Sequence, residues 1–188
     1  MVRWEPDSRG RLEQAALALY GERGYENTTV AEIAARAGLT ERTFFRYFAD
    51  KREVLFWGAG ALQDLLVSTV AGAPASAPPL DAVAAALQAA GALLQDRREG
   101  ARQRQAVIAA STELRERELI KLASLASAVA DALRRRGTSG PAATLTAEAG
   151  MAVFRVAVER WVDPRNTQDL PELIRESVDE LKVVTGSG

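Results

Sequence analysis

Residues 28–53 read TTVAEIAARAGLTERTFFRYFADKRE, and this stretch decides the expected fold. Thr29 and Glu32 have the spacing of a capping box, which predicts that a helix begins at this point. Gly38 interrupts that helix after about two turns, and Thr40 is a suitable N-cap for a second short helix. Two short helices joined by a turn of about three to four residues that contains glycine are typical of a helix-turn-helix, whose second helix enters the major groove of DNA.

The charge of the same stretch agrees with binding to phosphate. The whole chain has a net charge of −1, so its overall charge predicts no partner. Residues 36–52 differ, because they contain five basic residues (Arg36, Arg42, Arg46, Lys51, Arg52) and two acidic ones (Glu41, Asp50). A small positive patch on a nearly neutral protein favours contact with DNA phosphates. The backbone N–H groups that follow Thr28 and Thr29, and those that follow Asp50, are expected to add anion sites at helix N-termini.

The composition excludes most enzyme classes. The chain has no Cys and no His, which removes cysteine nucleophiles, thiolate sites, the usual general base and the commonest metal ligand. An all-helical enzyme using carboxylates such as Glu148 and Glu159 is the remaining catalytic alternative, but no acidic motif supports it. We therefore predict that the chain is not an enzyme and has no catalytic residue, metal or cofactor. No stretch approaches the ~18 consecutive apolar residues of a membrane span, and residues 1–11 lead into no apolar signal segment. A cytoplasmic location without a membrane partner is expected.

The remainder of the chain predicts an all-α fold of about nine helices. Helical periodicity, caps and breakers recur along its whole length, and no convincing alternating strand pattern is present. The fourth helix is expected to begin at a second capping box, Asp50-x-x-Glu53, and the ninth at a third, Asp169-x-x-Glu172. The Ala-, Pro- and Ser-rich segment 71–79 is predicted to be a loop. The expected helices cover about 8–23, 29–37, 40–47, 50–70, 80–94, 97–110, 119–136, 141–162 and the residues from 169 onward.

The run TTVAEIAARAGLTERTFFRYFADKREVL, with LEQAALALYGERGYENTTV before it, resembles the DNA-binding motif of the TetR family of bacterial transcriptional regulators. The resemblance covers about residues 8–57. A looser similarity, to the fatty-acyl-type and mycofactocin-type regulators of that family, lies in STELRERELIKLASLASAVADALRRRG. The resemblance implies a three-helix DNA-binding domain at residues 1–52, with its motif at about 29–48. It also implies a helical domain at residues 53–188 for ligand binding and dimerisation.

Carried over by position, the family pattern implies eight DNA-binding residues. Thr28 and Thr29 would bind phosphate, and Tyr47 and Lys51 would hold the DNA backbone. The side of the third expected helix (40–47) that faces the groove would carry Thr40, Arg42, Thr43 and Phe44. The family often has a small residue at the position of Arg42, which here could pair with guanine. It often has Tyr at the position of Phe45, which lacks the hydroxyl for a phosphate contact. Core packing is the alternative for the aromatic residues: it is favoured for Phe45 and Phe48, and left open for Phe44 and Tyr47.

In the second domain the resemblance implies a pocket and a dimer interface. The pocket would lie between the fourth, fifth, seventh and eighth helices, although core packing is expected for most of these side chains: Trp57, Leu62, Leu66, Leu87, Leu122, Leu125, Met151 and Phe154. The small residues of the eighth helix (Ala149, Gly150, Ala152, Ala157) and the apolar face of the ninth favour a homodimer through these two helices. The basic group Arg97, Arg98, Arg102 and Arg104 is a weak candidate for an anionic ligand. Residues 134–136 more simply suit the C-terminus of a helix.

These observations together predict a dimeric, ligand-responsive transcriptional repressor. Two recognition helices would bind successive major grooves of a palindromic double-stranded operator. A hydrophobic or acyl-type effector would favour a conformation that does not fit the operator, with the fourth helix as the lever. The alternative is a helical interaction protein that has kept the fold and lost specific DNA binding.

Overall fold

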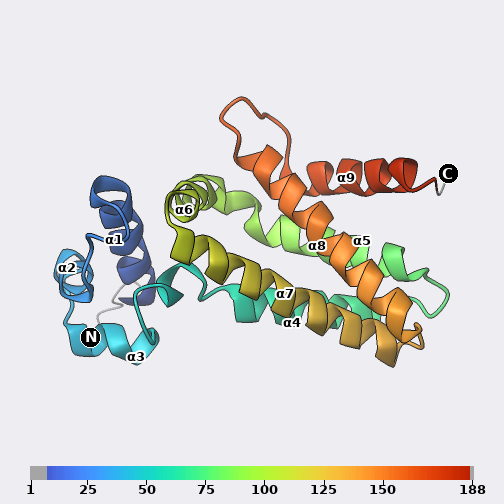
Figure 1. The fold of residues 1–188 in the computed structure, drawn as a ribbon, viewed down its shortest axis with the longest axis horizontal. Helices are drawn as coiled ribbons and strands as arrows, with labels where there is room; N and C mark the ends of the chain where they lie inside the picture. Colours follow the sequence, from blue (N-terminus) through green and yellow to red (C-terminus); the bar gives the residue numbers. More distant parts are fainter. Residues whose placement is uncertain (1–7, 187–188) are drawn as a thin grey trace, which may run out of the picture. The chain divides into compact units, whose positions relative to one another are not determined.

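The structure is a computed structural model that describes residues 8–186, and within this range the chain is all-helical, as the sequence predicts (Figure 1). It contains nine α-helices, two short 3-10 helices and no strand in the described range. The elements are α1 (Ser8–Arg23), α2 (Val30–Arg36), α3 (Glu41–Tyr47), η1 (Glu53–Leu55), α4 (Ala59–Gly72), α5 (Pro79–Leu94), η2 (Gln95–Arg97), α6 (Arg98–Ala110), α7 (Thr112–Arg135), α8 (Gly140–Val162) and α9 (Leu170–Val184).

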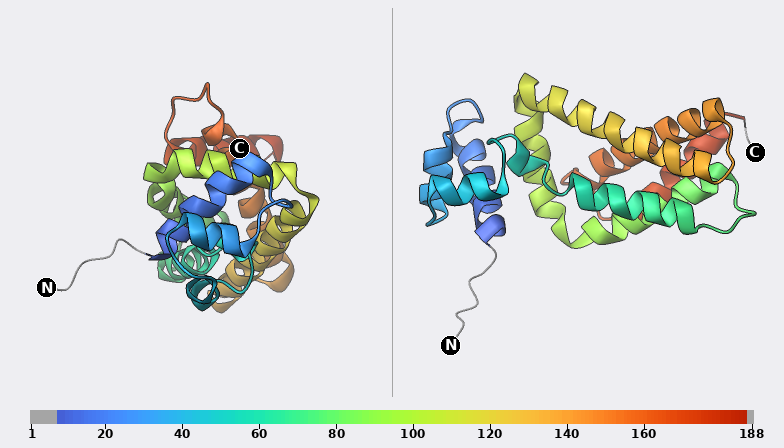
Figure 2. Two further views of the ribbon diagram at one scale, coloured as in Figure 1. Left: turned by 90° about the vertical axis from the view of Figure 1, so that its left-hand side faces the viewer. Right: turned by 90° about the horizontal axis from the view of Figure 1, so that it is seen from below.

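The chain divides into two compact units. The N-terminal unit contains Met1–Gly58 together with Arg102–Glu118, and the C-terminal unit contains Ala59–Ala101 together with Leu119–Gly188. The helices of each unit can be followed from two further sides in Figure 2. Compared with the boundary expected after residue 52, the N-terminal unit extends a few residues further. It also takes in the end of α6 and the beginning of α7, because side chains of residues 102–118 complete its core.

The core of the N-terminal unit joins the helix-turn-helix to this distant segment. Its buried side chains come from α1, α2, α3, η1, α6, the start of α7 and the turns that follow α1, α3 and η1. They are Leu12, Ala15, Ala16, Leu19, Tyr20, Tyr25, Ile33, Phe44, Phe48, Val54, Leu55, Phe56, Val107, Ile108 and Leu114.

Local capping places α2 and α3 where the sequence predicts them. The Thr29 hydroxyl accepts from the Glu32 N–H (3.2 Å), and the Glu32 carboxylate accepts from the Thr29 N–H (2.9 Å), so the first predicted capping box is confirmed. Gly38, with φ of +67°, ends α2 in the left-handed conformation. Its N–H donates to the carbonyl of Ala35, and the next N–H, of Leu39, donates to that of Ala34. This Schellman motif reverses the chain in a few residues and starts α3 at a fixed angle.

The predicted fourth helix is wrong in its first half. Asp50 accepts from two following backbone N–H groups, as a capping residue should. Only the single 3-10 turn Glu53–Leu55 follows, and α4 begins at Ala59. The physical reason is burial: Val54, Leu55 and Phe56 all enter the core of the N-terminal unit, which one continuous helical face could not achieve.

Within the described residues, one helical segment, Glu53–Gly72, has the length and mean hydropathy (1.4) of a membrane-crossing helix. The segment is not a run of consecutive apolar residues, because it contains Glu53, Gln63 and Asp64. The continuous helix inside it, α4, has 14 residues, which corresponds to about 21 Å of rise against a bilayer core of about 30 Å. Leu66 and Val70 of α4 are buried in the core of the C-terminal unit. Packing in this core explains why the helix is apolar.

Helix α5 is central to the C-terminal unit, where it packs against α4, α8 and α9. Glycine allows two of these approaches: a Cβ at Gly150 would lie 2.5 Å from Val83 Cγ1, and one at Gly91 would lie 2.8 Å from Ile174 Cδ1. The predicted third capping box is wrong, because Asp169 precedes α9 without capping it through its side chain. Gln95 replaces it, since its amide oxygen accepts from the Leu170 N–H (2.8 Å).

Candidate nucleic-acid interface

Helix α3 has a polar and charged outer side. Thr40 precedes the helix, and its hydroxyl accepts from the Thr43 N–H (3.2 Å), which confirms Thr40 as the N-cap. The two hydroxyls of these residues also lie 3.0 Å apart. The exposed side chains that follow Thr40 on the helix are Glu41, Arg42, Phe45 and Arg46. A short helix with this exposed set is suited to the edges of bases in a DNA groove.

Arg42 has no hydrogen-bond or ion-pair partner in the part of the chain that the structure describes. Its guanidinium therefore presents its N–H donors to solvent in a planar fork. This is the geometry that pairs bidentately with O6 and N7 of guanine or with a phosphate.

Phe44, by contrast, cannot contact a DNA groove, which corrects its predicted role. Its side chain is fully buried, whereas Phe45 is 55% exposed, so the expectations for the two rings are exchanged. Phe44 and Phe48 are four residues apart and therefore share the inner face of the helix; their ring centroids lie 5.3 Å apart. Neighbouring residues differ by about 100° around a helix, and this turns Phe45 outward.

Tyr47 lies at the end of α3 between two arginine side chains. The guanidinium carbons of Arg46 and Arg9 lie 4.9 Å and 5.7 Å from its ring centroid, and Arg46 donates to its hydroxyl (3.0 Å). The ring is half-buried. Its hydroxyl can still donate one hydrogen bond, so a phosphate contact by Tyr47 remains a prediction with two cations beside it.

Thr28 and Thr29 have different surroundings, although the sequence predicts the same role for both. Thr28 is 1% exposed, and its hydroxyl donates to the Gly24 carbonyl (2.9 Å). A phosphate contact through this side chain is therefore wrong: the hydroxyl holds the turn between α1 and α2. Thr29 is exposed at the N-terminus of α2, where it forms the capping box.

The ammonium group of Lys51 points toward the turn between α1 and α2. Nζ donates to the carbonyls of Tyr25 (2.9 Å) and Thr28 (3.0 Å), and it lies 4.2 Å from the centroid of the Tyr25 ring. The side chain is half-buried. Two of its three N–H donors are thus used within the chain, and at most one is left for a phosphate.

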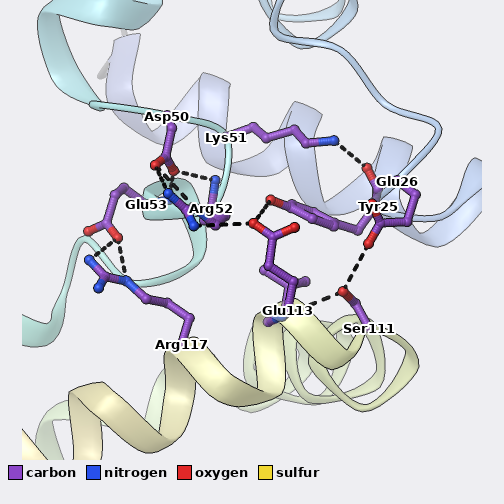
Figure 3. A network of polar contacts seen from close by, with 10 residues as sticks. Tyr25, Glu26, Asp50, Lys51, Arg52, Glu53, Ser111, Glu113 and Arg117 are labelled. Carbon is purple, nitrogen blue, oxygen red and sulfur yellow. Dashed lines mark hydrogen bonds and ion pairs between the residues drawn. The ribbon is translucent and has the colours of Figure 1, made fainter.

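A network of polar contacts fastens the start of α7 to the segment after α3 (Figure 3). Arg117 donates to the Glu53 carboxylate (2.8 Å) with both side chains largely shielded from solvent. Glu113 lies 3.3 Å from Arg52 and accepts from the Tyr25 hydroxyl (3.2 Å). The partners of the Arg117–Glu53 contact are 64 positions apart in the sequence, and those of the Tyr25–Glu113 contact are 88 positions apart. No local sequence pattern could therefore reveal them.

Asp50, Arg52 and Tyr25 of this network each keep one protonation state near neutral pH. The hydrogen bond from Arg52 lowers the pKa of Asp50 below its ordinary value, and the same contact raises the pKa of Arg52. Burial and then the charge of Glu113 raise the pKa of Tyr25, which keeps its hydroxyl a donor. These three groups therefore do not act as a switch at physiological pH.

Comparisons with known proteins agree with this geometry. Residues 13–56 match the sequence model described as bacterial regulatory proteins of the tetR family, and residues 77–185 match the one described as the MftR C-terminal domain. The second match covers more than half of the chain. The chain belongs to the TetR family. The first match spans α2 and α3, so it includes the predicted helix-turn-helix.

Two curated transcriptional regulators match part of the chain. HTH-type transcriptional regulator TcmR of Streptomyces glaucescens is 38% identical over 82 residues, which are 44% of this chain and 36% of TcmR. HTH-type transcriptional regulator HbdR of an Aromatoleum species is 36% identical over 50 residues, 27% of this chain and 22% of HbdR. The chain thus aligns with about a third or less of these relatives' lengths.

Solved structures extend the likeness of fold to almost the whole TetR-family chain. FadR of Bacillus subtilis in complex with stearoyl-CoA has a TM-score of 0.65 at 20% identity, and the alignment covers 92% of this chain and 96% of FadR. The SmeT–triclosan complex has a TM-score of 0.67 at 22% identity, and the alignment covers 94% and 90% of the two chains. At these identities the likeness concerns the fold.

Seven of the eight predicted effector-binding side chains belong to a single hydrophobic cluster of the C-terminal unit. Leu66, Leu87, Leu125, Met151 and Phe154 are buried in this cluster, and Leu62 and Leu122 pack against it. Trp57 is the exception and corrects the prediction: it packs against the core of the N-terminal unit, with Arg9 5.1 Å from its ring centroid.

Several basic residues considered as ligand or DNA sites have structural partners. Arg98 donates to the carbonyls of Trp161, Asp163 and Asn166 and so satisfies the C-terminus of α8. Arg104 donates to the Leu55 carbonyl (2.8 Å). No group of three or more acidic side chains that could hold a metal ion occurs among residues 8–186.

Proposed function

We propose that the chain is a dimeric transcriptional repressor that binds a palindromic DNA operator through α3 and leaves it when an apolar effector binds the C-terminal unit. The observation that carries DNA binding is the outer side of α3, where Arg42, which has no partner among residues 8–186, lies one turn before the exposed Arg46. Membership of a family of regulatory proteins supports this use of the helix. In this proposal the chain binds its operator in the cytoplasm and catalyses no reaction.

The test of DNA binding uses fluorescence anisotropy with duplexes from upstream of the protein's own coding region and a salt series. We expect specific binding that tightens as salt falls, and a loss of affinity in Arg42→Ala. Arg135→Ala is the matched control, because Arg135 is an exposed arginine of the C-terminal unit. If neither these duplexes nor a random duplex library yields a specific site at low salt, the alternative of an interaction protein without specific DNA binding replaces this proposal.

The proposed dimer uses the outer face of α8. Leu145, Ala149, Ala152 and Val156 follow one another at helical spacing; Leu145 is 72% and Val156 37% exposed. Two other small residues named for this interface, Gly150 and Ala157, are instead buried inside the C-terminal unit, Gly150 against Val83. A two-fold arrangement would bring the same stripe of two copies together. The apolar face of α9 that was expected to join it is buried within the C-terminal unit at Leu173, Ile174 and Val178, so α9 offers the exposed Val183 and Val184 instead.

Sedimentation of the purified chain tests the interface. Leu145→Glu places a charge in the stripe and should convert dimer to monomer at micromolar concentration. Leu119→Glu alters a leucine of similar exposure on α7 (64% exposed) and should leave the dimer intact. A monomeric wild type, or equal effects of both substitutions, would contradict the use of α8.

The proposed effector is apolar, because the side chains that are expected to surround it are themselves apolar. The hydrophobic cluster of the C-terminal unit offers Leu87, Leu125, Met151 and Phe154 and favours the apolar or acyl part of a small molecule. The stearoyl-CoA complex of FadR and the triclosan complex of SmeT support this chemical class. A thermal-shift screen with acyl-CoAs and apolar compounds, followed by measurement of DNA release, tests it. Compounds that raise the melting temperature without releasing DNA would contradict the proposed mechanism.

A further inference from the structure

The side chain of Phe45 is a large apolar group held on the outer side of α3. It is 55% exposed, although its neighbour Phe44 is fully buried. The two ring centroids lie 5.4 Å apart with an interplanar angle of 83°, so Phe45 packs edge-on against a ring that the core holds in place. The outward ring is thus supported from below, and an apolar surface is presented at a fixed place on the helix.

The surroundings of this ring are those of a DNA-reading surface. Arg42 lies one turn earlier on the same side and Arg46 is the next residue, and both are exposed. Their positive charges favour the groove of a polyanion over an apolar protein partner. Phe45 has no hydrogen-bond donor or acceptor and cannot recognise the polar edge of a base. The one apolar feature that a base displays in the major groove is the C5-methyl group of thymine.

We propose that Phe45 recognises the C5-methyl group of one thymine in each half-site of the operator. This inference rests on the proposed DNA-binding function and adds a base preference to it. Phe45 then sets specificity beside Arg42, through apolar contact instead of hydrogen bonding. Burying one methyl group corresponds to about a fourfold change in affinity per half-site, because a buried CH₂ contributes about 0.8 kcal/mol. Two half-sites of a palindrome give about fifteenfold.

The experiment begins with selection of binding sites for the full-length protein from a random duplex library. Each thymine of the selected site is then replaced by uracil, symmetrically in both half-sites, which removes the methyl group and keeps every hydrogen-bonding atom. We expect one symmetric thymine whose replacement weakens binding about fifteenfold. Phe45→Ala should bind thymine and uracil duplexes equally at that position. Arg42→Ala should bind both more weakly while keeping their ratio.

The outcomes separate this inference from the function on which it rests. If the wild type binds its selected site and no thymine-to-uracil replacement matters, the ring contacts sugar or solvent and the inference is wrong. It is also wrong if Phe45→Ala keeps the preference for thymine. If no site is selected, the DNA-binding function itself fails. Because Phe45 is more than half exposed, Phe45→Ala should keep the helical circular dichroism and melting temperature of the wild type.

Discussion

Replacing Lys51 with methionine distinguishes a structural lysine from a phosphate-binding one. Methionine keeps much of the length and apolar bulk of the side chain and removes the ammonium group. In the wild type this group donates to the Tyr25 and Thr28 carbonyls and lies over the Tyr25 ring. Lys51→Met should therefore loosen the turn between α1 and α2.

The size of the effect follows from these contacts. A hydrogen bond from a charged donor contributes about 1.5–3 kcal/mol, and a cation–π contact about 0.5–1 kcal/mol at an exposed site. Lys51 is half-buried, so water compensates part of the loss. We expect the free energy of unfolding to fall by about 2–4 kcal/mol, a large share of the roughly 5–15 kcal/mol of a typical domain.

We would compare the wild type and the variants by urea denaturation and by DNA binding across a salt series. Both measurements are made at a temperature where the variants are folded. Arg42→Met is the control, because Arg42 carries the same charge without a partner in the described chain; its unfolding free energy should change by less than about 0.5 kcal/mol. A phosphate contact contributes about 0.9 to the salt slope, or about 1.8 in a dimer. Lys51→Met with unchanged stability and a slope reduced by that amount would refute the structural role.

Three further predictions concern packing and pH. Phe44→Ala should lower the unfolding free energy by about 3–5 kcal/mol in urea denaturation, because the ring is fully buried. Gly150→Ala should lower the melting temperature, because the new Cβ would lie 2.5 Å from Val83 Cγ1, and Val83→Ala in the same chain should restore part of it. The hydrogen bond from Arg165 lowers the pKa of Asp163 from 3.8 to about 2, so Asp163→Asn should destabilise at neutral pH. That difference should shrink as the pH falls from about 4 to about 2, and thermal melts across this range would show it.

The helices themselves follow from local signals, which is why the sequence predicts them. Thr29, Glu32, Gly38 and Thr40 act through contacts within about five residues, and the structure has each at its expected boundary. The predicted continuous fourth helix is wrong because the decisive contact is tertiary. Phe56 enters a core built from distant segments, and this ends the 3-10 turn that Asp50 starts.

The sequence predicts where the candidate site lies, but it predicts less well which way its individual side chains point and what they contact. The inward direction of Phe44 had a usable signal, since it stands four residues before Phe48, for which core packing was expected. No such signal exists for Thr28 or Lys51. Both types of side chain bind phosphate readily. Only the fold shows that backbone carbonyls of the neighbouring turn already accept from the Thr28 hydroxyl and from two of the three N–H donors of Lys51.

The path of the chain limits how an effector in the C-terminal unit can influence α3. The backbone passes between the two units after Gly58, after Ala101 and after Glu118, and the last two passages lie inside α6 and α7. A continuous helix transmits displacement better than a loop. In the N-terminal unit, the start of α7 is attached through Arg117 and Glu53. A shift of α7 must therefore move the segment after α3 or break this contact. Because both side chains of this ion pair are largely shielded, and Leu114 of the same helix is buried in the core of the N-terminal unit, the start of α7 is held by more than one contact. If the proposed effector shifts α7, that helix is a more direct route to the segment after α3 than the interrupted α4 that the sequence suggests as the lever.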